Sequence, residues 1–140
     1  GPTGPQGEDG IVAIAKLYGP LLVENLTSPT YVFWGPTITV TVEPGQRVTA
    51  SLSAAVRGTA GEALYYAICY RLGPTGPPVH LGNMSSLVGF STDAFVTLSM
   101  DATSNPNDLV GTYSVGLCAT PNGGPVVYGN YVSGWVMIHN

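Results

Sequence analysis

Hydrophobic and polar residues alternate with a period of two along most of the chain, which is the pattern of half-buried β-strands. In the clearest case, 37–43, Ile38, Val40 and Val42 fall on one face and three threonines fall on the other. The same alternation recurs in 48–56, and β-branched residues of this kind favour extended backbone. We therefore predict strands at 11–18, 37–43, 48–56, 63–72, 95–100, 112–119 and 131–138, with shorter apolar pieces at 21–23, 31–34 and 126–128.

Glycine and proline punctuate these segments. The tetrapeptide 43–46 has proline at its second position and glycine at its third, the preference of a type II turn. We therefore predict that 37–43 and 48–56 form a hairpin. Further turns or loops are predicted at 58–61, 73–78, 101–108, 121–125 and 128–131.

The pattern of elements defines the fold class. No segment longer than about eight residues combines helical spacing with capping residues. Short strands separated by Gly/Pro turns are typical of an antiparallel β-sandwich or jelly roll. The strand 63–72 is apolar on both faces, so we expect it to be central in a sheet or to lie at a subunit interface.

The first ten residues follow a different rule. Glycine stands at positions 1, 4, 7 and 10, and proline follows it at positions 2 and 5. This is the collagen register, in which only glycine fits at the axis of three polyproline-II chains. The alternative is a flexible Gly/Pro leader with accidental spacing. The triplet interpretation predicts a homotrimer, with a stalk end at 1–10, a head at 11–140 and more stalk upstream in a longer protein.

Composition agrees with an assembly of subunits. Hydrophobic residues make up 44% of the chain and charged residues only 9%, below the usual quarter of a soluble domain. Burying neutral surface between subunits is the simplest way to keep such a chain in solution. Four scattered cations exclude a nucleic-acid footprint, and no apolar run approaches the length of about 20 residues that spans a bilayer. The cations are Lys16, Arg47, Arg57 and Arg71.

Two cysteines, Cys69 and Cys118, lie in predicted strands. They could form a disulfide or remain two buried thiols, because free cysteine is often buried. Two N-glycosylation sequons are present, at 25–27 and 83–85. The sequon is too short to identify the source of the protein.

Candidate chemistry is sparse, and we expect no enzyme activity and no cofactor. His80 and His139 are predicted to be surface residues, and no Gly-x-Ser-x-Gly motif is present. The loop between Asp101 and Asp108 offers carboxylate, amide and hydroxyl oxygens to calcium, although it lacks EF-hand spacing. A simple Asn-Pro turn is the alternative interpretation of this loop.

Aromatic residues give the candidate surfaces. Tyr128, Asn130 and Tyr131 are candidates for a ligand-facing tip that recognises sugar. Strands 63–72 and 131–138 are expected to line a threefold axis, although core packing is the ordinary role of clustered tyrosines. The candidate interface residues are Tyr66, Ile68, Tyr70, Trp135 and Met137.

Collagen triplets that run directly into an all-β domain give the chain a layout that resembles known families. Bacterial collagen-like surface proteins, spore-surface filaments, phage tail fibres and the complement C1q/tumour-necrosis-factor group share this layout. The aromatic and glycine pattern of C1q domains is not evident, so the resemblance favours a bacterial or phage fibre at a cell, spore or virion surface. It implies a C-terminal domain that trimerises and often binds a host surface. No site residues carry over from these families.

Two functions follow as expectations. The first is structural: the head holds three chain starts together and so nucleates and caps the collagen-like stalk, because tethering raises their effective concentration. The second is adhesion to a host glycan or protein, with trimeric display adding avidity. A glycosaminoglycan ligand would require the four cations to cluster.

Overall fold

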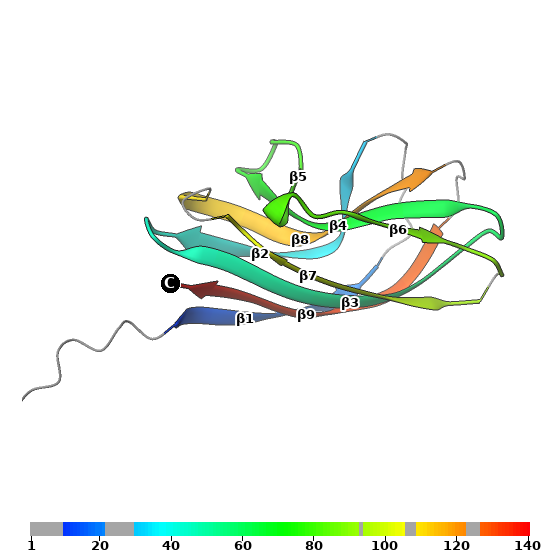
Figure 1. Ribbon diagram of the computed structural model, residues 1–140, viewed down its shortest axis with the longest axis horizontal. Helices are drawn as coiled ribbons and strands as arrows, with labels where there is room; N and C mark the ends of the chain where they lie inside the picture. The colour runs from blue at the N-terminus through cyan, green and yellow to red at the C-terminus, as the bar shows by residue number, and fades with distance from the viewer. Residues whose placement is uncertain (1–9, 22–29, 93, 106–108, 123–126) are drawn as a thin grey trace, which may run out of the picture.

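The chain folds into two antiparallel β-sheets stacked face to face (Figure 1). The computed structural model describes residues 10–21, 30–92, 94–105, 109–122 and 127–140. The strands are β1 (Ile11–Pro20), β2 (Val32–Val42), β3 (Arg47–Gly58), β4 (Ala63–Leu72), β5 (Val79–His80), β6 (Ser86–Gly89), β7 (Val96–Thr103), β8 (Gly111–Asn122) and β9 (Val127–His139), with one 3-10 turn, η1 (Leu81–Asn83).

The first sheet has four strands in the order β1-β9-β3-β7. The second has five, in the order β2-β8-β4-β5, with β6 also paired to β4. Consecutive long strands therefore alternate between the two sheets. The predicted all-β antiparallel sandwich is confirmed. No described helix is long or apolar enough to cross a membrane.

The core lies between the sheets and follows from the alternation in the sequence. Along β3, every second residue from Val48 to Val56 is buried, and its neighbours on the other face are partly exposed. Trp34 of β2 is fully buried at 0% exposure and is the largest side chain of this core. Other members come from each sheet, including Leu17, Leu52, Leu64, Ile68, Leu98, Val115, Leu117 and Val136.

The predicted hairpin between 37–43 and 48–56 is wrong, although its turn forms. The amide of Gln46 donates to the carbonyl of Glu43, and Gly45 has a φ of 85°, as a type II turn requires. However, β2 pairs with β8 in the second sheet, and β3 pairs with β7 and β9 in the first. A turn reverses the chain but does not decide whether the strands it joins pair with each other.

Two predicted irregular segments are strand instead. The predicted turn at 128–131 lies inside β9 (Val127–His139), where the register with β3 shifts at a β-bulge between Gly129 and Val132. The predicted loop from Asp101 begins inside β7, where Asp101 and Thr103 are exposed and Ala102 is buried. Cross-strand pairing with β3 and β1 outweighs the local polarity of both segments.

A second, smaller core lies on the outer face of the second sheet. Cys69 and Cys118 form a disulfide between β4 and β8, with their Cα atoms 5.7 Å apart. Ala67 packs with them, and Tyr31 and Phe33 cover the cluster. The two options that the sequence left open for these cysteines are thereby decided in favour of pairing. A disulfide is consistent with an extracellular protein.

Candidate functional site

Strand β1 exposes apolar side chains at one edge of the first sheet. Every residue from Ile11 to Lys16 is exposed, although β1 is paired with β9 over its length. Ile14 is 60% exposed, and exposed aliphatic residues on an edge strand invite association with another chain. We define the apolar edge patch as Ile11, Val12, Ile14, Tyr18 and Tyr131.

Aromatic contacts hold one end of this patch in place. Tyr18 and Tyr131 stack with their ring centroids 5.4 Å apart and their planes 16° from parallel. The Lys16 ammonium lies 5.3 Å from the Tyr18 ring centroid, within cation–π distance. Ordered aromatic side chains lose little conformational entropy on binding, so the patch is suited to a protein partner.

A hollow of about 170 Å³ lies beside the edge patch, between β1 and β2. Ala13 and Ala15 of β1 line it together with Val40 of β2, so the sandwich is open on this side. Alanine side chains are too short to close the gap between the sheets. The apolar surface therefore continues from the outer face of β1 toward the core.

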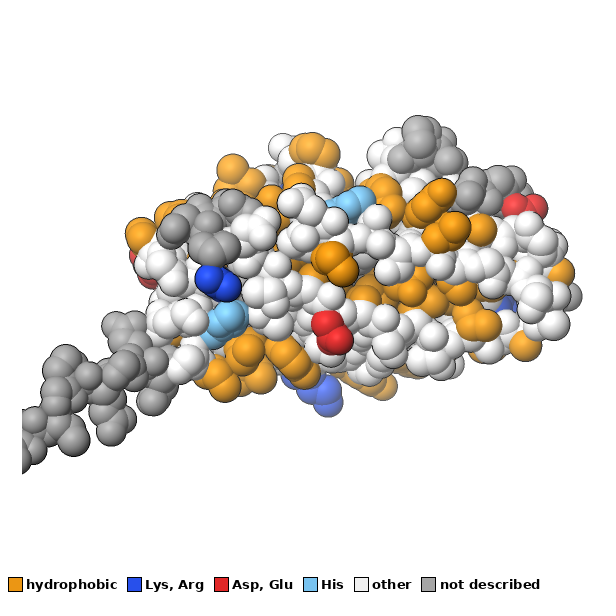
Figure 2. Space-filling model, viewed as in Figure 1, with side chains coloured by type: hydrophobic (Ala, Val, Ile, Leu, Met, Phe, Trp, Pro, Cys, Tyr) orange, Lys and Arg blue, Asp and Glu red, His pale blue; other side chains and the backbone are white. Residues whose placement is uncertain are grey.

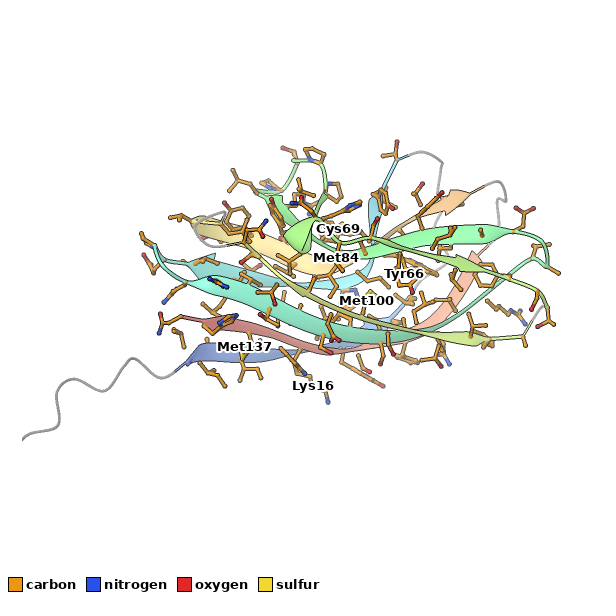
Figure 3. The ribbon with its side chains drawn as sticks, in the orientation of Figure 1. Lys16, Tyr66, Cys69, Met84, Met100 and Met137 are labelled. Carbon is orange, nitrogen blue, oxygen red and sulfur yellow. A yellow bond between two sulfur atoms is a disulfide. The ribbon has the colours of Figure 1, made fainter. Side chains whose placement is uncertain are left out.

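The opposite side of the sandwich has a second apolar hollow, of about 240 Å³, between β7 and the loop that precedes β6. Figure 2 shows hydrophobic side chains in this hollow, and Figure 3 shows the side chains of Tyr66, Met84 and Met100 gathered there. Met84 and nearby Leu87 are exposed. We call this hollow the seam, and its apolar side chains are Tyr66, Ile68, Met84 and Met100.

The outer face of the first sheet has a polar character away from β1. A groove of about 370 Å³ crosses β9, β3 and β7, and small side chains form its floor. The hydroxyls of Ser53 and Ser133 lie 3.4 Å apart across two strands. We call this the serine groove, with side chains from Ser51, Ser53, Ser99, Asp101, Ser133 and Trp135.

The five predicted interface residues divide between two environments. Tyr66, Ile68 and Tyr70 point into the sandwich, where Ile68 is 1% exposed and belongs to the protomer core. Trp135 and Met137 point outward from β9 and pair with Lys16 and Ile14 of β1, respectively. Strand β4 is central in its sheet, which accounts for its apolar character on both faces.

Among the predicted ligand and calcium residues, Asn130 and Tyr131 are exposed on β9. The side chain of Tyr128 and the whole of Asp108 lie outside the described residues. Asp101 faces the serine groove, and its strand neighbour across the sheet is Ser51. Within the described ranges, no three His, Cys, Asp or Glu residues gather to hold a metal ion.

Both histidines have partners that sequence reasoning did not find. The His139 ring nitrogen Nε2 lies 2.7 Å from the Thr49 hydroxyl, which lies 2.9 Å from the Thr103 hydroxyl. This ladder ties β9, β3 and β7 together across the sheet. The His80 ring makes an edge contact with Tyr31, with centroids 4.4 Å apart. Burial raises the pKa of the Tyr31 phenol above its usual 10.0.

The four cations do not cluster within one protomer. Arg47 and Arg57 stand ten residues apart on β3, about 33 Å at the rise of a strand. Lys16 lies on β1, and the Arg71 guanidinium lies 5.0 Å from the Phe33 ring centroid on the outer face of the second sheet. A glycosaminoglycan would therefore meet isolated charges on a single protomer.

The geometry defines a class of protein: a two-sheet antiparallel β-sandwich, stapled by a disulfide, with apolar surface at two opposite edges. Comparison with known proteins does not narrow that class, because no protein-family model matches the chain and no curated protein matches it either.

Proposed function

We propose that this domain is a homotrimeric head that nucleates and caps a collagen-like stalk at an extracellular surface. The apolar edge patch carries the proposal, because it begins at the residue that follows the last collagen-type glycine, Gly10. A monomer would leave Ile11, Val12 and Ile14 in water beside a sheet edge. Assembly would cover them at the point where three chain starts must meet.

The position of the chain ends supports this arrangement. The amide of Asn140 donates to the carbonyl of Gly10 at 2.8 Å, and Ile11 pairs with His139. The start of β1 is thus held by β9 and leaves the sandwich at a defined place (Figure 1). A fixed exit point favours alignment of three glycine-rich strands because it removes part of their orientational freedom.

The two apolar surfaces also suit a ring of subunits. A closed ring of three requires two different patches on each subunit, each binding the other patch on a neighbour. The apolar edge patch lies at the β1 edge of the first sheet, and the seam lies at the β7 edge. Each copy would offer its edge patch to the seam of the next, and a ring of three requires each contact to turn the next copy by about 120°. The alternation of consecutive long strands between the two sheets supports the jelly roll expected from the sequence.

Sedimentation equilibrium tests the proposal directly. The chain is expected to show three times its protomer mass of 14.5 kDa at micromolar concentration. A chain that begins at Gly10 is expected to remain trimeric, because the head supplies the contacts. A full chain that sediments as a monomer would contradict the assembly role. Loss of trimer only in the shortened chain would place the contacts in the triplets instead.

A further inference from the structure

The serine groove combines three chemical features in one hollow: the indole of Trp135, the carboxylate of Asp101 and a set of serine hydroxyls. Neither assembly contact nor catalysis accounts for this combination. We propose that the serine groove is a binding site for a neutral saccharide that packs on Trp135 and hydrogen-bonds to Asp101.

Strand register places these groups in two parallel rows. In the first row Trp135 pairs with Ser51, which pairs with Asp101, across β9, β3 and β7. In the second row Ser53 pairs with both Ser133 and Ser99. Neighbouring strands lie about 4.8 Å apart, so the backbone positions of the indole and the carboxylate are about 10 Å apart. That span accommodates one pyranose ring between them.

The chemistry of a sugar matches both rows. A pyranose has an apolar C–H face, which packs on an aromatic ring, and an edge of hydroxyl groups. Asp101 is exposed in β7 and accepts hydrogen bonds from a pair of adjacent hydroxyls. Serine hydroxyls both donate and accept, so Ser51, Ser53 and Ser99 satisfy the remaining sugar hydroxyls. The volume of about 370 Å³ falls within the range of small-molecule sites.

The same groups argue against other ligands. Among the described residues that line the groove, Asp101 alone is charged, so an anionic sugar or a phosphate would meet a like charge there. A single carboxylate does not hold calcium, which takes about six to eight oxygen ligands. The hydroxyl floor offers few apolar contacts to an apolar peptide.

Tryptophan fluorescence provides a specific assay. The two tryptophans differ in access: Trp34 is fully buried in the core, whereas Trp135 lines the groove. Titration of the full chain with glucose, galactose, mannose, N-acetylglucosamine, lactose and maltose is expected to give, with at least one sugar, a saturable blue shift at millimolar concentration. The same titration is expected to reduce quenching of Trp135 by acrylamide. If none of these sugars gives a saturable change, the proposal is overturned.

Variants connect the signal to the groove. Asp101→Asn and Ser51→Ala are each expected to weaken binding about tenfold, the effect of one lost hydrogen bond to a charged or neutral group. Glu43→Gln is the matched control, because Glu43 is an exposed acid in the turn before β3. It is expected to bind like the parent chain. Equal binding by Asp101→Asn and the parent chain would overturn the assignment, and unchanged melting temperatures would verify that each variant is folded.

This proposal is independent of trimer formation. Sedimentation of the same samples reports assembly, whereas the fluorescence of Trp135 reports the groove. A trimer that shows no sugar response contradicts the saccharide site alone. A monomer that shows a saturable response contradicts the assembly role alone.

Discussion

Replacing Ile14 by lysine is expected to dissociate the trimer without unfolding the protomer. Ile14 is 60% exposed on the edge strand of the first sheet, so the folded protomer does not depend on its burial. Exposed substitutions of this kind change the free energy of unfolding by less than about 0.5 kcal/mol. The effect is therefore expected in association rather than in folding.

The magnitude follows from the exposed fraction. Complete burial of an isoleucine side chain stabilises by about 1.5–3 kcal/mol. Covering the remaining 60% of Ile14 would therefore contribute about 1–2 kcal/mol in each protomer, and about 3–6 kcal/mol in the trimer. Loss of that energy weakens association by a factor of about 10² to 10⁴. Desolvation of the lysine ammonium adds to the penalty.

Leu72→Lys is the matched control. Leu72 is 65% exposed at the end of β4 in the second sheet, outside the apolar edge patch and the seam. The Leu72→Lys variant tests whether lysine at any exposed aliphatic position dissociates the trimer. Sedimentation equilibrium over a concentration series is expected to show Ile14→Lys as a monomer and Leu72→Lys as a trimer. A fully trimeric Ile14→Lys chain, or a dissociated Leu72→Lys chain, would refute the assignment of the interface to β1.

Three further outcomes concern stability. Replacing Cys69 and Cys118 by alanine is expected to lower the free energy of unfolding by about 4 kcal/mol in urea titrations, because the disulfide closes a 49-residue separation. Gly134→Ala is expected to cost at least about 1–3 kcal/mol in the same assay. The new Cβ would collide with the Ser51 carbonyl oxygen of β3 and lie 2.9 Å from the Leu52 Cα, and both are backbone atoms. An unchanged urea midpoint would count against this. Because folding raises the pKa of Tyr31, the unfolded chain ionises first, and stability is expected to fall as pH rises above 10.0. Tyr31→Phe is expected to flatten this decline.

Local patterns in the sequence were sufficient for the long strands, whereas the short strands β5 and β6 and the end of β7 were missed. The alternation over 63–72 predicted β4 with its observed bounds, and 48–56 lies inside β3. Period-two alternation is a reliable signal here because each strand of the sandwich has one face on the core. The turn at 43–46 was likewise readable from its proline and glycine.

The partners of each strand were not readable in the same way. Alternation states that one face is buried, but it does not state which strand lies alongside. The chain therefore gave no sign that β2 and β3 belong to different sheets, or that β9 lies between β1 and β3. These pairings join residues far apart in sequence, and their energy comes from contacts that form only in the assembled core.

The candidate sites depended on those pairings. Sequence reasoning placed Tyr66, Ile68 and Trp135 in one interface, whereas the fold directs Tyr66 and Ile68 into the sandwich beside the seam and Trp135 onto the outer face of the first sheet. The sequence suggested Asp101 only as a calcium ligand together with Asp108. In the fold, Asp101 of β7 instead lies opposite Ser51 of β3. Composition by itself determined that this chain has too few charges to cover its own surface. Only the tertiary structure decided where the uncovered surface lies, because the side of a sheet that a residue occupies is set by cross-strand register.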